Sequence, residues 1–315
     1  MTEIAVLSGK GGTGKSSISA AFATLNGKVV LADCDVDAAN LYLIFNPSHE
    51  EEVVYISGSK AVIDYSLCTN CGSCMDYCRF DAISLINDKV SISEIACDGC
   101  VLCSRICPEN AIKMVANDKS RMYSGSFRNG KMIYGRLAPG EENSGKLVNM
   151  VREKAKQVAK ENGLETIILD GPPGIGCPVI STLTGVSKVV IVTEPTISGL
   201  HDMQRIMGIV QKFNLKAYVI INKYDLNTSM STQIKKWCKE SKITVSGELP
   251  FDKNMVESMV QGKSITEFNQ DLNISKKIEK IWNKILNQKK RVICLKRSRW
   301  KELKTLLLLH QEKEA

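Results

Sequence analysis

Hydrophobic residues along this chain gather into short, nearly continuous runs, and longer stretches with helical spacing lie between them. Five runs have the length of buried strands, and they lie at residues 3–8, 28–33, 165–170, 188–193 and 216–222. Runs without polar alternation are typical of parallel strands that are covered on both faces. Helical spacing follows at residues 15–25, 145–161 and 199–213. This alternation predicts an α/β fold with a mostly parallel, doubly wound sheet.

One segment, residues 58–120, interrupts this alternation. It contains two cysteine runs with the spacing Cys-x2-Cys-x2-Cys-x3-Cys, each followed by Ala-Ile, at an offset of 29 residues. A repeated unit indicates two equivalent sites. We therefore predict a small α+β domain at 58–120 that is inserted into the α/β domain, whose two parts are residues 1–57 and 121–286.

The composition limits the function classes. Of the 315 residues, 43% are hydrophobic and 24% are charged, which is ordinary for a soluble globular protein. No apolar run approaches the ~20 residues of a membrane-spanning helix, and the first residues show no secretory signal. We expect a cytoplasmic protein.

The net charge of +8 is concentrated in a basic C-terminal extension, residues 287–315, which carries nine Lys and Arg against three Glu. The rest of the chain is close to neutral, so we expect no nucleic-acid partner. Apolar residues in the extension have roughly helical spacing, and a basic amphipathic helix can lie on an anionic membrane. Four consecutive leucines, 306–309, spread around such a helix, so we prefer a solvated extension to a membrane contact.

A glycine-rich loop follows the first predicted strand. The sequence from Gly9 to Ser16 matches the phosphate-binding pattern G-x-x-x-x-G-K-[ST]. The backbone N–H groups of such a loop and the dipole of the following helix bind an anion. Lys15 is expected to reach the β- and γ-phosphates and Ser16 to bind Mg²⁺. The expected nucleotide-binding residues of this segment are Gly9, Lys10, Gly11, Gly12, Thr13, Gly14, Lys15, Ser16 and Ser17.

Polar residues end the other predicted strands. Asp33 and Asp35 end the second strand, and Asp170 ends the third, where an aspartate can bind Mg²⁺ through water. Asn222 begins the sequence Asn-Lys-Tyr-Asp, and its amide can read the edge of a purine base. GTPases also use this sequence, so the residues alone do not separate ATP from GTP.

The two cysteine runs have the spacing of two-cluster ferredoxins, in which the fourth cysteine of each run binds the other cluster. The predicted ligands of the first [4Fe–4S] cluster are Cys68, Cys71, Cys74 and Cys107, and those of the second are Cys97, Cys100, Cys103 and Cys78. Pro108 follows the second run as in ferredoxins, but Arg79 follows the first. Zinc is the alternative metal. Zinc sites usually pair two separated Cys-x2-Cys knuckles and often recruit histidine, and no histidine is near these runs.

The phosphate loop, the strand-end acids, the Asn-Lys-Tyr-Asp sequence and the inserted cysteine runs occur in an order that resembles the Mrp/MinD-type P-loop ATPases with an inserted two-[4Fe–4S] ferredoxin domain. The resemblance covers residues 1–286 and extends to the wider MinD/ParA/nitrogenase-iron-protein class. It implies ATP as the nucleotide, with Mg²⁺ and two [4Fe–4S] clusters as cofactors. It also implies that Lys10 acts across an ATP-bound homodimer and that Asp35 orients the attacking water. Asp33 would then lie near the Mg²⁺ shell, and Asp37 is a lower-ranked rival for the role of Asp35.

These observations lead to two functional hypotheses. The first is an ATP-hydrolysing iron–sulfur protein, with Lys10, Lys15 and Asp35 as catalytic residues. Nucleotide-driven dimer closure would be coupled to electron transfer or to iron–sulfur handling for a client protein. The alternative is a MinD-like ATP-dependent spatial or membrane-associated switch with accessory clusters. No sequence pattern identifies the client or the electron donor.

Overall fold

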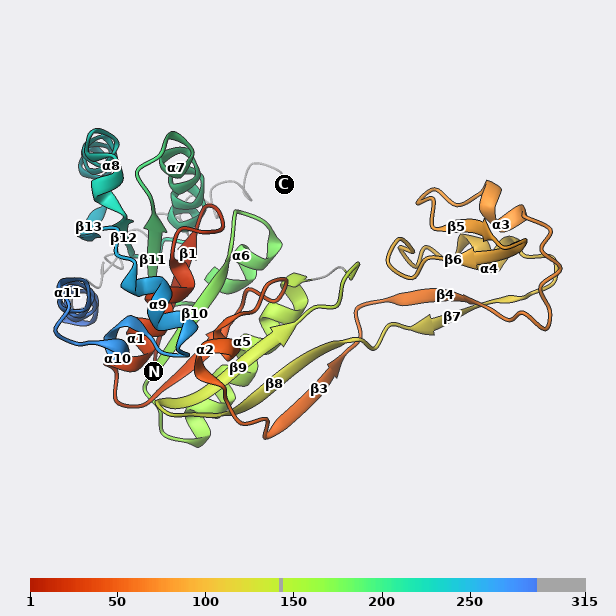
Figure 1. Cartoon of the computed structure of the whole chain (residues 1–315), viewed down its shortest axis with the longest axis horizontal. Helices are drawn as coiled ribbons and strands as arrows, with labels where there is room; N and C mark the ends of the chain where they lie inside the picture. The colour runs from red at the N-terminus through yellow and green to blue at the C-terminus, as the bar shows by residue number, and fades with distance from the viewer. Residues whose placement is uncertain (142–143, 288–315) are drawn as a thin grey trace, which may run out of the picture.

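A large sheet forms the centre of the computed structural model, which describes residues 1–141 and 144–287 (Figure 1). Its strands are β1 (Thr2–Ser8), β2 (Val29–Asp33), β3 (Glu51–Tyr55), β8 (Ser120–Phe127), β9 (Gly130–Arg136), β10 (Thr166–Pro173), β11 (Lys188–Thr193), β12 (Ala217–Asn222) and β13 (Thr244–Leu249). The nine strands are ordered β13-β12-β11-β1-β10-β2-β9-β8-β3. Neighbours from β13 to β9 are parallel, and β8 and β3 add an antiparallel edge. The predicted α/β fold with a mostly parallel sheet is confirmed.

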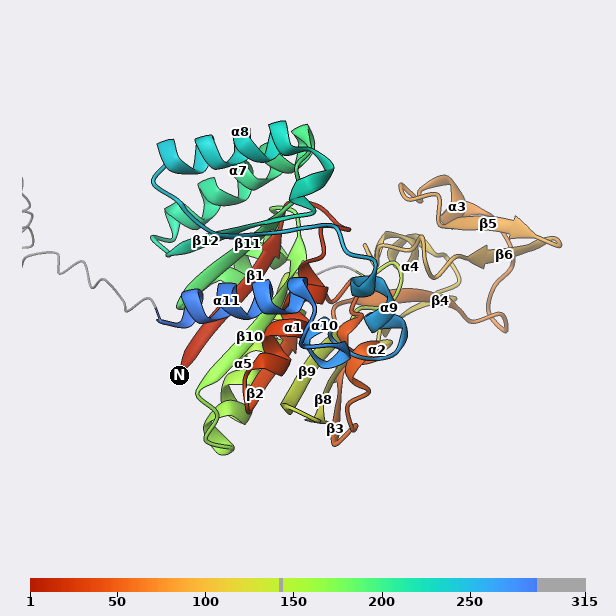
Figure 2. The same cartoon turned by 60° about the vertical axis from the view of Figure 1, so that its left-hand side comes forward.

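Helices cover both faces of this sheet (Figure 2). They are α1 (Lys15–Leu25), α2 (Leu41–Phe45), α5 (Ser144–Glu161), α6 (Cys177–Leu183), α7 (Ile197–Lys212), α8 (Thr228–Glu240), α9 (Asn254–Val260), α10 (Ile265–Phe268) and α11 (Asn273–Asn287), with a 3₁₀ turn at Tyr224–Leu226. Buried residues of α5 to α8 form one core with the sheet, and those of α1, α2, α10 and α11 form the other. Cover on both faces explains the continuous Val, Ile and Leu runs of the central strands.

The carboxyl ends of the parallel strands meet at one edge of the sheet, and this positions the phosphate loop. The loop follows β1 directly, and β1 lies between β10 and β11. Asp170 of β10 is in register with Asp33 at the end of β2. These two aspartates, which are far apart in the sequence, therefore lie side by side on neighbouring strands. Ligands of open α/β sheets bind at this edge.

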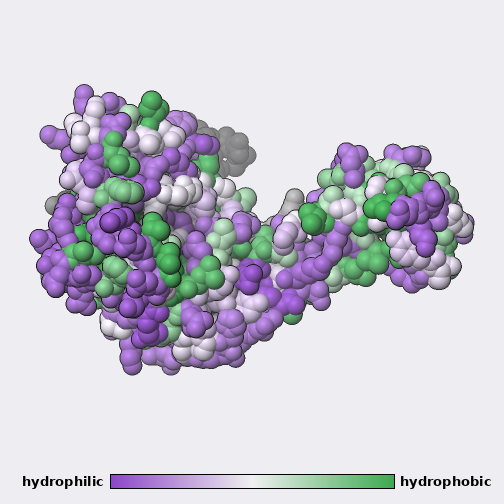
Figure 3. Space-filling model, viewed as in Figure 1, coloured by the Kyte–Doolittle hydropathy of each residue, from purple (hydrophilic) through white to green (hydrophobic). Residues whose placement is uncertain are grey.

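A second, smaller lobe is built from the elements between β3 and β8 (Figure 3). Its elements are β4 (Ser59–Ile63), α3 (Ser73–Asp76), β5 (Ile83–Ile86), β6 (Lys89–Ile92), α4 (Leu102–Ile106) and β7 (Ile112–Ala116). β4 pairs with β7 and β5 with β6, both antiparallel and both outside the large sheet. The lobe has a hydrophobic core of its own, and it lies at one end of the long axis of the molecule (Figure 1).

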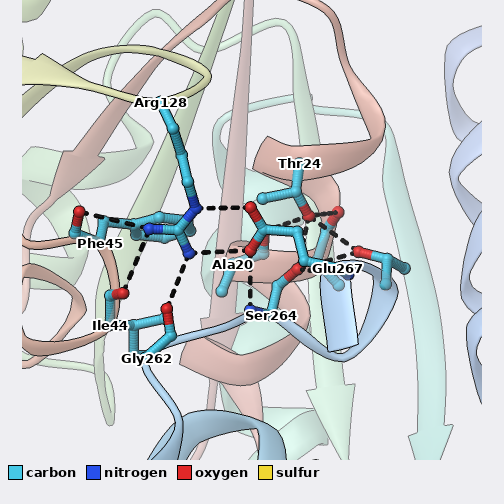
Figure 4. A network of polar contacts seen from close by, with 10 residues as sticks. Ala20, Thr24, Ile44, Phe45, Arg128, Gly262, Ser264 and Glu267 are labelled. Carbon is cyan, nitrogen blue, oxygen red and sulfur yellow. Dashed lines mark hydrogen bonds and ion pairs between the residues drawn. The ribbon is translucent and has the colours of Figure 1, made fainter. Parts of the chain in front are cut away.

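Arg128, in the turn between β8 and β9, anchors the antiparallel edge of the sheet to neighbouring helices and loops (Figure 4). Its guanidinium binds both carboxylate oxygens of Glu267, at 2.5 and 2.9 Å, and the carbonyl oxygen of Gly262 at 2.9 Å. It also lies over the ring of Phe45, 4.8 Å from the centroid. The turn between β8 and β9 is therefore tied to α2, to α10 and to the segment between α9 and α10.

The basic extension predicted at residues 287–315 lies outside the described residues from position 288 onward. Within the described part of the chain, no helix is long and apolar enough to cross a membrane.

Candidate functional site

The phosphate loop makes a tight turn between Ser8, the last residue of β1, and Lys15, the first of α1. Gly12 and Gly14 have φ angles of +79° and +88°, a conformation that residues with a Cβ rarely adopt. A Cβ on Gly14 would also lie 2.5 Å from Nδ2 of Asn222. Glycine at this position therefore allows both the turn and its close packing.

The predicted magnesium and phosphate residues come together around Asp170. Its buried carboxylate accepts hydrogen bonds from Lys15 Nζ at 2.9 Å and from Ser16 Oγ at 2.7 Å. Lys15 Nζ also lies 3.6 Å from a carboxylate oxygen of Asp35. Ser19, which the sequence reasoning missed, donates to the second oxygen of Asp170 at 2.6 Å. Ser19 lies four residues after Lys15, so both side chains lie on one face of α1. This spacing could have identified Ser19 as a site residue.

Buried charges in this cluster shift one another's pKa values. Burial lowers the pKa of Lys15, but Asp170, Asp33 and Asp35 outweigh burial, and the net pKa is raised. Burial raises the pKa of Asp33 to about 7, with a further contribution from the charge of Asp170. Burial also raises the pKa of Asp35 and of Asp37. The lysine is therefore held charged, while the raised pKa values of Asp33, Asp35 and Asp37 favour their protonated forms.

Asp33 has a structural place in the loop after β2. Its carboxylate accepts hydrogen bonds from the backbone N–H groups of Asp35 (3.1 Å), Asn40 (3.1 Å) and Leu41 (3.2 Å). Asp35 and Asp37 instead line the cavity beside the phosphate loop. Both remain candidates for orienting water, and the choice of Asp35 over Asp37 stays a prediction.

The cavity beside the phosphate loop measures about 580 Å³, within the usual range of ~300–1,000 Å³ for small-molecule sites. Met259 of α9 forms part of its wall, and its Sδ lies 3.0 Å from Ser17 Oγ. The lining residues are Ser8, Gly11, Gly12, Thr13, Gly14, Lys15, Ser16, Ser17, Asp35, Asp37, Ala38, Asn40, Pro172, Pro173, Gly176, Pro178 and Met259. The cavity is therefore lined by predicted phosphate-binding residues, by residues that follow β2 and by residues at and after the end of β10.

The predicted residues Gly9, Lys10, Asp170 and Asn222 do not line the cavity. Lys10 Nζ forms an ion pair with Glu194 at 2.5 Å and a hydrogen bond with Ser198 Oγ at 3.3 Å. Asn222 is buried, and its Nδ2 donates to the carbonyl oxygen of Thr13 at 2.8 Å. Asn222 thus holds the backbone of the phosphate loop, and its contact with a base stays a prediction.

A family model described as the CobQ/CobB/MinD/ParA nucleotide binding domain matches residues 4–265. The chain belongs to this family. An uncharacterized protein of Methanocaldococcus jannaschii is 36% identical over 230 residues, which cover 71% of this chain and 79% of the relative. The septum site-determining protein MinD of Neisseria meningitidis serogroup B is 24% identical over 277 residues, 83% of each chain.

Solved structures support the same fold for this CobQ/CobB/MinD/ParA family member. The cell division ATPase MinD of Pyrococcus furiosus matches with a TM-score of 0.55 at 17% identity, over 90% of this chain and 98% of that chain. MinD of Pyrococcus horikoshii, solved with Mg-ADP, matches with a TM-score of 0.53 at 18% identity, over 90% and 95%. The nine-stranded sheet with its phosphate loop is therefore the MinD-like P-loop NTPase fold.

The smaller lobe contains two hollows, each lined by four cysteines. One is lined by Cys68, Cys71, Cys74 and Cys107, and the other by Cys78, Cys97, Cys100 and Cys103. Each hollow therefore receives three cysteines from one run and the fourth from the other run, which is the grouping that the ferredoxin spacing predicts. All eight thiols are free of disulfides.

The two hollows repeat one local structure. The N–H of Ala82 donates to Cys78 Sγ at 3.4 Å, and the N–H of Ala111 donates to Cys107 Sγ at the same distance. N–H donors of this kind stabilise a thiolate. Across the described residues, no three His, Cys, Asp or Glu side chains come close enough to hold a single metal ion.

Proposed function

We propose that this family member is an ATP-hydrolysing iron–sulfur protein. In it, nucleotide-driven closure of two copies is coupled to electron transfer or to iron–sulfur handling for a client protein. The observation that carries the proposal is the pair of four-cysteine hollows on the same chain as the MinD-like phosphate loop. The smaller lobe, residues 58–120, would be an inserted ferredoxin-like domain, and residues 1–57 and 121–286 would form the ATPase domain.

The donor set of each hollow fits a [4Fe–4S] cluster better than zinc. The four thiolates of a [4Fe–4S] cluster each bind a different iron and so stand farther apart than four thiolates around a single zinc ion, each about 2.3 Å from it. The cysteines lie around hollows in two groups of four, and the apolar residues Ile63, Ile83 and Ile112 pack beside them. One cysteine of each group, Cys71 or Cys100, is exposed to solvent. Such clusters, when bound, store single electrons at potentials set by their surroundings.

ATP with Mg²⁺ is the proposed nucleotide of the larger lobe. Lys15 and the loop N–H groups would bind the phosphates, and Ser16 and Asp170 would hold Mg²⁺, Asp170 through water. The nucleotide must take Lys15 and Ser16 from their present contacts with Asp170. Lys10 does not line this cavity, and its ion pair with Glu194 would have to open for it to reach the nucleotide of a second copy of the chain. This placement supports a role across a dimer.

Exchange of single cysteines tests the proposal. Cys107→Ser should damage the cluster held by Cys68, Cys71 and Cys74, although Cys107 belongs to the second run. The matched variant Cys103→Ser should damage the other cluster. Iron content and EPR spectra of the reduced proteins report which cluster is lost. Damage by Cys107→Ser only to the cluster of Cys97, Cys100 and Cys103 would contradict the crossed ligand sets.

A second candidate, a MinD-like spatial or membrane-associated switch, is favoured by the septum site-determining relatives. The test is flotation with anionic liposomes, with and without ATP, for the full chain and for a chain that lacks residues 288–315. ATP-dependent flotation that is lost on truncation would favour this switch. Absence of flotation in every condition would exclude the membrane-associated form of this function.

A further inference from the structure

Lys60, the second residue of β4, places a buried positive charge beside one of the two cysteine hollows. Its side chain is largely shielded from solvent, with 8% of the residue exposed. Its Nζ donates to the carbonyl oxygen of Cys97 at 2.6 Å and to that of Gly140 at 3.1 Å. Both acceptors are neutral carbonyl oxygens. Lys60 also lines a separate hollow at the base of the lobe, together with Asp98 and Glu141.

The internal repeat shows that this contact is specific to one hollow. The offset of 29 residues equates Lys60 with Lys89 and Cys97 with Cys68. The neighbours of the two lysines keep the equivalence, because Ala61 and the corresponding Val90 are both buried. Lys89, however, is exposed to solvent on β6. The two sites therefore have the same ligands and similar local backbone but different charge environments.

The same lysine joins this hollow to the larger lobe. Gly140 lies in the segment that follows β9, and a Cβ on it would meet the carbonyl oxygen of Ile95 at 2.6 Å. Leu137, in the same segment, donates its N–H to the carbonyl oxygen of Val36 at 2.9 Å. Val36 lies between the two aspartates that line the nucleotide cavity. The segment that carries Cys97 thus contacts the nucleotide-binding lobe.

We propose that Lys60 raises the reduction potential of the cluster held by Cys97, Cys100, Cys103 and Cys78 above that of the cluster held by Cys68, Cys71, Cys74 and Cys107. This inference rests on the proposed function. A nearby positive charge favours the state with one more electron, and a buried charge is screened less than an exposed one. At equilibrium, a single electron from a one-electron reductant would then reside on the cluster beside the nucleotide-binding lobe. Lys60 is a positioning residue: its charge acts on the cluster, and its side chain does not bind iron.

The test is a reductive titration of anaerobic holoprotein with dithionite and mediators, followed by EPR. Three variants are compared with the natural chain: Lys60→Met, which removes the charge at similar length, Lys60→Arg, which keeps it, and Lys89→Met, the control in the other repeat. The Cys71→Ser and Cys100→Ser backgrounds assign each reduction wave to one cluster. Iron, sulfide and thermal unfolding are measured for every variant, so that loss of a cluster is not mistaken for a change of potential.

Lys60→Met should lower the reduction equilibrium constant of the second cluster about tenfold, which is about 59 mV for a one-electron couple. The first cluster should change little, Lys60→Arg should restore most of the difference, and Lys89→Met should leave both waves in place. Unchanged potentials in Lys60→Met with both clusters present would overturn the role of Lys60 and leave the proposed function intact. Absence of iron and sulfide from the natural chain would overturn both.

Discussion

Substitution of Asp170 separates the charge of the nucleotide site from its hydrogen bonding. The carboxylate is buried and accepts hydrogen bonds from Lys15, Ser16 and Ser19. In Asp170→Asn, the amide oxygen can face Lys15 and Ser16 while the NH₂ group donates to the hydroxyl of Ser19, which also accepts. Asparagine therefore keeps the hydrogen bonds and removes the charge. Asp170→Ala removes both.

The expected magnitudes differ between the two variants. A hydrogen bond to a charged group contributes about 1.5–3 kcal/mol and one between neutral groups about 0.5–1.5 kcal/mol. Asp170→Asn should therefore lower the free energy of unfolding by about 1–2 kcal/mol by the same comparison. Asp170→Ala breaks a buried ion pair, which costs about 3–5 kcal/mol. Asp35 still faces Lys15 at 3.6 Å, so the loss should be near 3 kcal/mol, or roughly 4–5 °C in Tm for a chain of this length.

Thermal unfolding without nucleotide at pH 6 measures these losses. At this pH Asp33 is largely protonated, because its pKa is about 7, so relief of its repulsion with Asp170 does not mask the effect. The control is Asp271→Asn, whose side chain is 93% exposed, with an expected change within about 0.5 kcal/mol. Calorimetric titration should show that Asp170→Asn weakens ATP binding more with Mg²⁺ than without it. Wild-type stability in both variants would refute the reasoning.

Three further predictions follow from the same site. The folded-state pKa of Asp33, about 7, lies above its ordinary value of 3.8, so the folded state binds the proton more tightly. The free energy of unfolding should therefore fall as the pH rises from about 4 to 7, and denaturant titrations of Asp33→Asn should lack this component. Lys15→Ala should abolish nucleotide binding, whereas Lys10→Ala should retain it but lose ATP-dependent dimerisation in sedimentation; equal loss of binding would contradict their separate roles. Asp35→Ala should bind Mg-ATP normally but hydrolyse it slowly in a phosphate-release assay, and a normal rate would make Asp37 the candidate.

The elements that could be predicted from the sequence are those whose signal is local. The phosphate loop and the cysteine runs are read from consecutive residues, and five central strands are read from continuous apolar runs. Four strands of the sheet, β3, β8, β9 and β13, escaped prediction, and two of them, β13 and β3, lie at its edges. Edge strands expose part of their side chains, so β3 has mainly exposed residues and β13 has buried residues only at two positions. Such strands lack the continuous apolar run.

Contacts between distant segments could not be predicted from the sequence. The ion pair of Lys10 with Glu194 joins residues that are 184 positions apart, and the hydrogen bond of Asn222 with Thr13 joins residues that are 209 apart. Only the order of the strands brings these pairs together. The same holds for Lys60. In the sequence it is an ordinary charged residue of a short strand, and only the fold brings its Nζ to the carbonyl oxygen of Cys97.

The central claim, that this P-loop ATPase carries two iron–sulfur clusters, is tested most directly by iron and sulfide analysis of protein that is purified without oxygen. The account predicts about eight iron and eight sulfide ions per chain, because each of the two clusters contains four of each. One or two zinc ions per chain without sulfide would contradict it.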